Sequence, residues 1–250
     1  MRDWKEETQK IITWMRKKVE EAKAQGVVLG MSGGIDSSVV AVLAQKALGE
    51  NSLGIMMPCY SIPKDLEDAL EVAKMFSIPH RIIPLEKPYD AFLEVLGEKE
   101  ENSRSLALAN LKPRLRMCTL YYFANRLNYL VCGASNRSEI TVGYFTKYGD
   151  GGVDILPIAH LTKTEVRELA RFLSLPSSLI TKPPSAGLWE GQTDEEEMGI
   201  TYEKIDEFIL YQKGEEPYLS KIKNRIQQSE HKRKMPATLE EITIQFFSSD

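Results

Sequence analysis

Gly30-Met-Ser-Gly-Gly-Ile-Asp-Ser37 joins a short apolar run to a segment of helical character. Residues 27–30 predict a buried strand, and residues 38–48 predict a helix. Glycines let the backbone of such a loop approach a ligand closely, and successive N–H groups at a helix start attract an anion. The stretch therefore predicts a phosphate-binding loop between a strand and a helix.

The same residues exclude two familiar nucleotide-binding loops. A Walker loop needs a lysine directly after its last glycine, whereas Ile35 and Asp36 follow Gly34 here. The G-x-G-x-x-G pattern of redox dinucleotide proteins is not matched either. The structural alternative is a flexible turn with Asp36 as the helix N-cap. The length of the motif and its place between strand and helix favour the phosphate loop.

Strands and helices alternate along the chain on both sides of this loop. The predicted strands are 27–30, 53–57, 81–85 and 130–133, and the predicted helices are 4–24, 38–48, 65–76 and 103–127, with Pro113 as a break or a first-turn residue. This alternation implies parallel pairing and right-handed crossovers. We expect an α/β fold, a Rossmann-like parallel sheet flanked by helices, in a single domain spanning residues 1–250.

Two further features lie in the second half of the chain. Residues 162–165 and 193–196 both fit the Ser/Thr-x-x-Glu capping box, each before a helical pattern. Between them, residues 181–191 are rich in proline and glycine. We expect a mobile lid there that closes over the substrates, with Ser185 approaching ATP and Trp189 reporting closure.

Composition narrows the class of protein. Hydrophobic residues make up 42% of the 250 residues and the formal net charge is −4, which gives no general field for binding nucleic acid, although residues 221–234 are locally basic. No stretch approaches the roughly 20 apolar residues needed to span a membrane, and the N-terminus has no apolar leader, so we expect a cytoplasmic location. Cys59, Cys118 and Cys132 form no metal-binding or disulfide pattern.

The loop resembles the Ser-Gly-Gly-x-Asp-Ser motif of the ATP pyrophosphatase, or PP-loop, superfamily, which has the adenine nucleotide alpha hydrolase-like fold. This resemblance implies a loop that grips the departing pyrophosphate of ATP. The motif alone leaves several families open, among them amidating ligases, argininosuccinate and asparagine synthetases, GMP synthetase and tRNA-thiolating enzymes.

Five segments remote from the loop are similar to the ammonia-dependent NAD synthetase family and occur in the same order. These segments are 143–157, 161–167, 182–188, 191–202 and 229–233. The resemblance covers most of the chain, while residues 85–105 and the last dozen carry no signal. It implies a ligase that forms a C–N bond by amidating deamido-NAD to NAD in an ATP-driven reaction, with release of AMP and pyrophosphate.

The resemblance also implies which residues bind each ligand. It assigns ATP to Gly30, Met31, Ser32, Gly33, Gly34, Ile35, Asp36, Ser37, Lys163 and Ser185. It assigns Mg²⁺ to Asp36 and Glu139. It assigns deamido-NAD to Arg114, Lys147, Asp154, His231 and Lys232.

Each of these residues also has a structural alternative. Arg114, Lys147 and Lys163 could be solvated surface charges, the usual fate of a lone cation. Lys163 has an independent argument, because it would stand in the first turn of a capped helix, where amides and ammonium together oppose phosphate charge. Glu139 follows a strand end, the edge where open α/β sheets bind ligands. His231 gains its role from the resemblance alone.

Two positions depart from the family pattern. Many members have threonine where Ala134 stands, so one hydroxyl contact to ATP is missing or is replaced, with Ser135 as the nearest substitute. Ser185 replaces a common threonine and keeps the hydroxyl.

The family's chemistry proceeds through an acyl adenylate, since a free carboxylate is a poor acyl donor. Asp36 would act in adenylylation, and Asp150 is the residue that we expect to attract ammonium and help to remove its proton. The competing role of Asp150 is an Asx-type turn. Glutamine-using relatives carry an additional amidase domain, for which 250 residues leave no room, so free ammonia or a separate amidotransferase would supply the nitrogen.

The expected partners are deamido-NAD, ATP and ammonia, with no nucleic acid and no membrane. The resemblance implies a homodimer, for which the helical stretch 103–127 could supply an apolar face. Two rival interpretations remain. One is a tRNA-modifying ATP pyrophosphatase, and the other is a non-catalytic adenine-nucleotide sensor that would not need Asp36 and Glu139 together.

Overall fold

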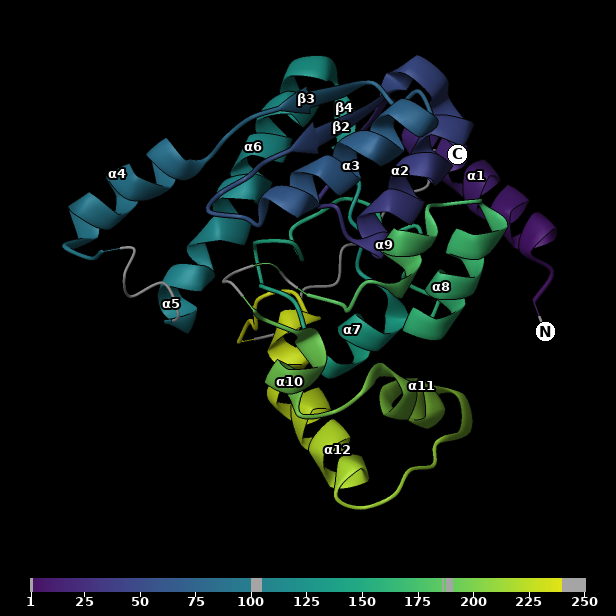
Figure 1. The fold of residues 1–250 in the computed structure, drawn as a ribbon, viewed down its shortest axis with the longest axis vertical. Helices are drawn as coiled ribbons and strands as arrows, with labels where there is room; N and C mark the ends of the chain where they lie inside the picture. The colour runs from purple at the N-terminus through teal and green to yellow at the C-terminus, as the bar shows by residue number, and fades with distance from the viewer. Residues whose placement is uncertain (1, 100–104, 186, 188–190, 240–250) are drawn as a thin grey trace.

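The structure, a computed structural model, describes residues 2–99, 105–185, 187 and 191–239. Its centre is a four-stranded parallel sheet with the strand order β3-β2-β1-β4 (Figure 1). The strands are β1 (Gly26–Gly30), β2 (Ser52–Met56), β3 (His80–Ile82) and β4 (Tyr129–Val131). Val28 lies between Leu53 on one side and Val131 on the other. The parallel α/β fold predicted from the sequence is confirmed.

Alternate side chains of the central strand enter two different cores. Val27 and Leu29 pack into one apolar cluster, and Val28 packs into another, as the two-residue period of a strand requires. The first cluster lies under α1 (Trp4–Glu21), α2 (Ile35–Leu48), α3 (Pro63–Met75) and α8 (Lys163–Phe172). The second lies under α4 (Glu86–Leu96), α5 (Leu106–Ala109) and α6 (Leu111–Leu127). Helices therefore cover both faces of the sheet.

A third apolar cluster joins the helices of the second half of the chain. Its members include Val142, Tyr202 and Ile222. It holds together α7 (Arg137–Val142), α11 (Tyr202–Tyr211) and α12 (Tyr218–Gln228), and Figure 1 shows these helices with α10 (Asp194–Met198) below the sheet. The short α9 (Ser177–Thr181) follows α8. The 3-10 turn Glu230–Lys232 follows α12.

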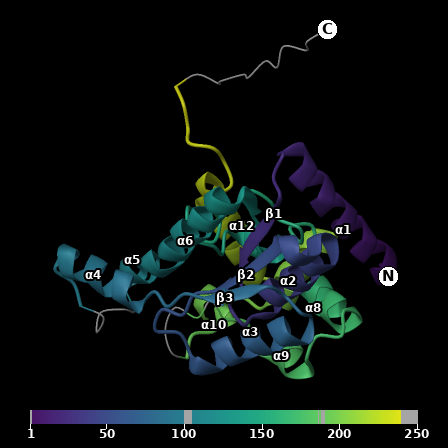
Figure 2. The same cartoon turned by 90° about the horizontal axis from the view of Figure 1, so that it is seen from above.

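The structure refines several predicted elements. The helical stretch 103–127 is divided at Asn110 into α5 and α6, and Pro113 lies in the first turn of α6, one of the two roles expected for it. The strand expected at 81–85 ends at Ile82. No helix was predicted over α4, which lies at the periphery of the molecule in both views (Figures 1 and 2).

Both expected helix caps are present, but only one is a complete capping box. Thr162 and Glu165 exchange both bonds of the box at the start of α8. Thr193 caps α10 by accepting from the Glu196 N–H, whereas its hydroxyl donates to the Glu196 carboxylate at 2.8 Å. The expected reporter Trp189 lies outside the described residues. None of the helices among the described residues is long and apolar enough to cross a membrane.

Candidate active site

The loops after β1 and β4 open side by side at the carboxyl edge of the sheet. The chain runs from β1 toward β2 in one direction, whereas β4 pairs with the opposite side of β1. Such a reversal of strand order leaves a crevice in which open α/β sheets bind their ligands. The predicted phosphate loop follows β1, and the segment with Glu139 follows β4. The topology alone therefore brings the two predicted metal ligands to one crevice.

The phosphate loop is built on a glycine that no other residue could replace without rearrangement. Gly33 has φ +77°, and a Cβ at this position would lie 2.0 Å from the carbonyl oxygen of Asp65. The loop hydroxyls are drawn together, with Ser32 Oγ 3.0 Å from Ser37 Oγ, and Ser32 Oγ accepts from the Gly34 N–H at 3.2 Å. Hydroxyls and amides at the N-terminus of α2 are the groups that bind phosphate oxygens.

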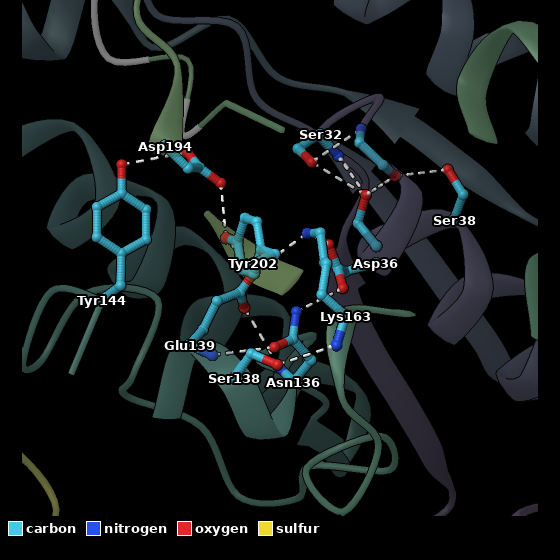
Figure 3. Close-up of polar contacts among 12 residues, drawn as sticks. Ser32, Asp36, Ser38, Asn136, Ser138, Glu139, Tyr144, Lys163, Asp194 and Tyr202 are labelled. Atoms are coloured by element: carbon cyan, nitrogen blue, oxygen red, sulfur yellow. Dashed lines mark hydrogen bonds and ion pairs between the residues drawn. The ribbon is translucent and has the colours of Figure 1, made fainter. Parts of the chain in front are cut away.

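Asp36 is not the N-cap of α2. The N-cap is Gly34, which offers no side-chain cap, and Asp36 lies within the first helical turn. Its Oδ1 accepts from Asn136 Nδ2 at 2.9 Å, and its Oδ2 forms an ion pair with Lys163 Nζ at 2.5 Å (Figure 3). The alternative role of Asp36 as the helix N-cap is thus wrong, and its carboxylate faces the crevice.

Glu139 has two functions, one for each carboxylate oxygen. Asn136 and Glu139 form a complete capping box at the start of α7, in which Oε2 of Glu139 accepts from the Asn136 N–H at 3.2 Å. Oε1 lies 3.2 Å from Lys163 Nζ and 3.3 Å from the Tyr202 hydroxyl oxygen. The capping box therefore fixes the side chain so that Oε1 points at the lysine.

Lys163 carries the positive charge of this cluster. It is the first residue of α8, after the Thr162 cap, and its side chain is 3% exposed. Its ammonium pairs with Asp36 and Glu139 and lies 4.8 Å from the centre of the Tyr202 ring. Burial alone would lower the pKa of Lys163, but the two carboxylates more than offset this and raise it. Lys163 therefore stays charged.

Burial shifts the pKa of Glu139 in the opposite direction. Desolvation raises the pKa of Glu139 to about 8; the Asp36 carboxylate adds to this and the Lys163 ammonium opposes it. Both carboxylates can be ionised together only if a cation beyond Lys163 offsets the second negative charge. The cluster is therefore suited to a further cation.

Other side chains hold the cluster in place. The Tyr202 hydroxyl donates to Asp194 at 2.8 Å, and the Tyr144 hydroxyl donates to the other oxygen of Asp194 at 3.1 Å (Figure 3). Asp206 accepts from the Ser138 hydroxyl and, at 2.9 Å, from the Thr164 N–H. These bonds hold α7, α8, α10 and α11 together around Asp36, Glu139 and Lys163.

A second group of predicted residues meets around the loop 143–152. Lys147 Nζ donates to the His231 carbonyl at 2.6 Å, and Lys232 Nζ donates to the carbonyls of Gly143 and Phe145 at 2.9 and 2.8 Å. The His231 ring faces the Gln228 carbonyl with its Nδ1. Burial lowers the pKa of Lys232. The structure thus brings these three residues together and uses both lysines to pin the loop to the chain that follows α12.

Three other predicted residues border this loop. Arg114 is exposed and reaches the Lys147 carbonyl at 3.5 Å. Asp150 accepts from the Thr146 N–H at 2.9 Å, which is the turn role that was weighed against catalysis. Asp154 accepts from the Val131 N–H at 2.7 Å and from the Tyr121 hydroxyl at 2.9 Å. Asp154 therefore has a clear structural function at the edge of β4.

The predicted lid begins with an anchored residue. Lys182 Nζ lies 2.7 Å from both Asp65 Oδ1 and Asp68 Oδ2, and 3.5 Å from the Gly33 carbonyl of the phosphate loop. Ser185 is exposed, and its hydroxyl accepts from the Gly187 N–H at 3.1 Å, so the structure does not bring it to the Asp36 cluster.

Sequence reasoning missed several side chains of the site. Asn136 had a local signal, because Asn136-Arg-Ser-Glu139 is a capping box with asparagine as the cap. Tyr202 and Asp194 had none, since both reach the cluster from α11 and α10, far along the chain. Lys182 and Arg116 were also missed, and their partners lie on α3 and after β2.

Comparison with known proteins agrees with this geometry. Residues 7–236 match the family described as NAD synthase. The chain is 52% identical over 235 residues to the NH(3)-dependent NAD(+) synthetase of Carboxydothermus hydrogenoformans, a match that covers 94% of this chain and 97% of that protein.

Two solved structures share the whole fold. An NMN synthetase from Francisella tularensis superimposes with a TM-score of 0.90 at 40% identity, covering 95% of this chain and 99% of the other. An NH3-dependent NAD synthetase from Campylobacter jejuni, in complex with the nitrate ion, gives a TM-score of 0.79 at 36% identity and covers 96% and 100%.

Proposed function

The chain belongs to the NAD synthase family, and on that premise we propose that it is an ammonia-dependent ligase that converts deamido-NAD to NAD at the expense of ATP. The observation that carries the proposal is the meeting of Asp36, Glu139 and Lys163 beside the phosphate loop. A non-catalytic nucleotide sensor would not need this paired-carboxylate cluster. The family match over residues 7–236 disfavours the tRNA-modifying alternative.

The proposed reaction has two steps. An oxygen of the nicotinate carboxylate forms a bond to the α-phosphorus of ATP, and the bond from that phosphorus to the bridging oxygen breaks, so the electron pair leaves with pyrophosphate. Ammonia then forms a C–N bond at the activated carbonyl, AMP leaves and a proton is lost. The loop from Gly30 to Ser37 holds the pyrophosphate through its amides and hydroxyls, and Lys163 opposes the charge that accumulates there.

The side chains fit a magnesium ion held by Asp36 and Glu139. No group of three or more His, Cys, Asp or Glu side chains that could hold a metal occurs among the described residues. Mg²⁺ needs only one or two carboxylates when phosphates and waters complete its shell. Both carboxylates already converge on one cation, the ammonium of Lys163. When bound, the metal would offset negative charge on the phosphates.

Deamido-NAD is proposed to lie along the loop 143–152, toward Arg114, Lys147, Asp154, His231 and Lys232. Lys147 and Lys232 donate only to neutral carbonyls in the described residues, so their charges remain to oppose phosphate. ATP would extend from the phosphate loop toward Lys163, and Ser185 would reach it only if the lid closes. Asp150 is proposed to receive the proton of ammonium. Desolvation raises the pKa of Asp150, in the direction that a base requires at neutral pH.

A second substrate has structural support. The NMN synthetase from Francisella tularensis superimposes with the higher TM-score, 0.90 against 0.79 for the NAD synthetase from Campylobacter jejuni. Amidation of nicotinate mononucleotide would use the same carboxylate and the same adenylate. The two substrates differ only in the adenylyl half of the dinucleotide.

One experiment tests both candidates. The protein is incubated with ATP, Mg²⁺ and ammonium together with deamido-NAD, nicotinate mononucleotide or tRNA, and AMP, pyrophosphate and amidated product are measured. We expect the highest kcat/KM with deamido-NAD. A higher value with the mononucleotide would move the assignment to an NMN synthetase, and AMP formation that depends on tRNA alone would refute both.

We also propose a homodimer formed through the projecting α4 and its neighbours α5 and α6. Apolar side chains are exposed along these helices, with Phe92 50%, Val95 87%, Leu106 60% and Tyr122 56% exposed. Patches of this kind mark interfaces. Light scattering at micromolar concentration should give a dimer that Val95→Asp converts to a monomer; a wild-type monomer would contradict the proposal.

Two broader proposals accompany this function. Residues 1–250 are proposed to act as one catalytic domain, since the family match spans most of them. A cytoplasmic location is supported by Cys59, Cys118 and Cys132, all of which are free thiols.

A further inference from the structure

Arg116 lies at the carboxyl edge of the sheet, beside the mouth of the phosphate loop. It belongs to the first half of α6, the helix that packs on β1 and β4. One turn further along α6, Leu120 reaches the loop itself, because a Cβ on Gly30 would lie 3.8 Å from it. The Arg116 Nε donates to the carbonyl of Met57, just beyond the end of β2, at 3.2 Å.

The guanidinium has no carboxylate partner within ion-pair distance among the described residues. Its two hydrogen bonds go to neutral acceptors, the Met57 carbonyl and, at 3.3 Å, the Ser61 hydroxyl. Desolvation lowers the pKa of Arg116, and the charges of Asp150, Asp65 and Glu86, none of them in ion-pair contact with it, offset this only in part. A desolvated cation in this state is costly unless a ligand supplies the negative charge.

Two other cations near the phosphate loop, Lys163 and Lys182, behave differently. Lys163 contacts Asp36 and Glu139, and Lys182 contacts two carboxylates on α3. Among the described residues, Arg116 thus lacks the direct carboxylate contact that Lys163 and Lys182 have. Arg116 also lies between the loop 143–152 and the phosphate loop. It interacts electrostatically with Asp150 of the substrate loop and with Asp65, whose backbone abuts Gly33 of the phosphate loop.

We propose that Arg116 binds the α-phosphate of ATP and of the acyl adenylate. This inference rests on the proposed function and adds a residue to it. The phosphate loop receives the two phosphates that depart, so the α-phosphate must lie outside the loop, on the side from which the nicotinate attacks. Arg116 stands between the loop and the segment proposed to hold that nicotinate. A planar guanidinium can donate two parallel bonds to a phosphate, which a lysine cannot.

The competing role of Arg116 is to hold the segment after β2 by its bonds to Met57 and Ser61. The two roles differ in which ligand they affect. AMP carries only the α-phosphate, whereas inorganic pyrophosphate carries only the departing pair. Loss of an α-phosphate contact weakens AMP binding and spares pyrophosphate, and a loosened segment has no reason to distinguish them.

The test is calorimetric titration of the full chain with AMP and, separately, with pyrophosphate and Mg²⁺. Arg116→Gln should weaken the binding of AMP by about tenfold or more, which is the usual effect of losing a charge-assisted hydrogen bond. The affinity for pyrophosphate should not change. Arg116→Lys retains the charge and is the milder change if the first variant folds poorly. It should weaken the binding of AMP severalfold. Arg126→Gln, on the same helix but bonded to the Tyr122 hydroxyl, serves as the matched control.

Ser61→Ala separates the two roles, because it removes the loop bond and keeps the guanidinium. We expect wild-type AMP affinity in this variant. Equal weakening by Ser61→Ala and Arg116→Gln, or equal loss of AMP and pyrophosphate, would overturn the proposal. Weaker binding of deamido-NAD with normal AMP affinity would assign Arg116 to the dinucleotide instead. NAD synthesis by the wild type is measured first, so that failure of the function and failure of this inference remain distinct.

Discussion

Replacement of Lys163 by methionine should destabilise the protein, and the loss should grow with pH. The variant leaves Asp36 and Glu139 facing each other without their cation, although their side chains are only 16% and 15% exposed. Removal of one partner from a buried ion pair costs about 3–5 kcal/mol. Glu139, with a pKa of about 8, already carries a proton over most of its population near pH 7, which limits the repulsion there. We therefore expect a smaller loss, about 2–3 kcal/mol near pH 7.

The assay is urea denaturation in EDTA at pH 6 and pH 8.5. Protonated Glu139 should limit the loss at pH 6, and the charged pair should increase it at pH 8.5. Added Mg²⁺ should stabilise the variant more than the wild type, because the two carboxylates then lack a competing ammonium. Lys204→Met, which removes a partly exposed lysine that pairs with Glu207 across one helical turn and with Glu215, is the control and should show no measurable loss. A variant as stable as the wild type at both pH values, with no response to Mg²⁺, would refute the reasoning.

The remaining predictions concern other charged groups. In EDTA, the wild-type free energy of unfolding should contain a part that falls as pH rises from 5.5 to 7.5, because native Glu139, with a pKa of about 8, retains a proton that the unfolded chain has released. Glu139→Gln should remove up to about 1.4 kcal/mol per pH unit of that slope; identical slopes in urea titrations would count against it. Asp36→Asn should reduce AMP formation by at least roughly a hundredfold with the fold retained, and near-normal AMP release would exclude a catalytic role. Lys182→Met should raise the KM for ATP more than it lowers kcat, since it frees the segment tied to Asp65 and to the Gly33 carbonyl; the opposite split would contradict this. Asp150→Asn should slow turnover at limiting ammonium, and wild-type rates there would leave Asp150 with its turn alone.

The parts of the fold that the sequence predicted are those with a local physical cause. The apolar run 27–30 and the glycine loop predicted β1 and a helix after the loop, because period and backbone conformation depend on adjacent residues; α2 begins at Ile35, three residues before the predicted start. The helix α4 was missed since its apolar positions are only partly buried, with Phe92 and Val95 exposed. A helix of this kind is specified by what packs against it, which a local pattern does not contain.

The site was predictable to the extent that topology forces residues together. Asp36 and Glu139 follow two neighbouring strands, so any parallel sheet with this order must bring them to one crevice. The Lys163 contact follows from the capped start of α8. By contrast, Tyr202 joins Glu139 through the packing of α11 on α7, and such tertiary contacts leave no local signal.

The residues assigned by resemblance show why a motif gives a position and not a role. Lys232 lies where the family pattern places it, yet its ammonium donates to the carbonyls of Gly143 and Phe145. Gly143 itself has φ +67°, and a Cβ there would lie 2.0 Å from the Cβ of Ser229. The loop and the chain after α12 are therefore fitted to each other without any ligand. A lysine committed in this way can contact a phosphate with its remaining hydrogen while it holds the loop, so a mutation of Lys232 would combine both effects. Arg116 also donates to a backbone carbonyl, that of Met57, but Ser61→Ala tests part of its structural role separately, so its substitution is the cleaner probe of substrate charge at this crevice.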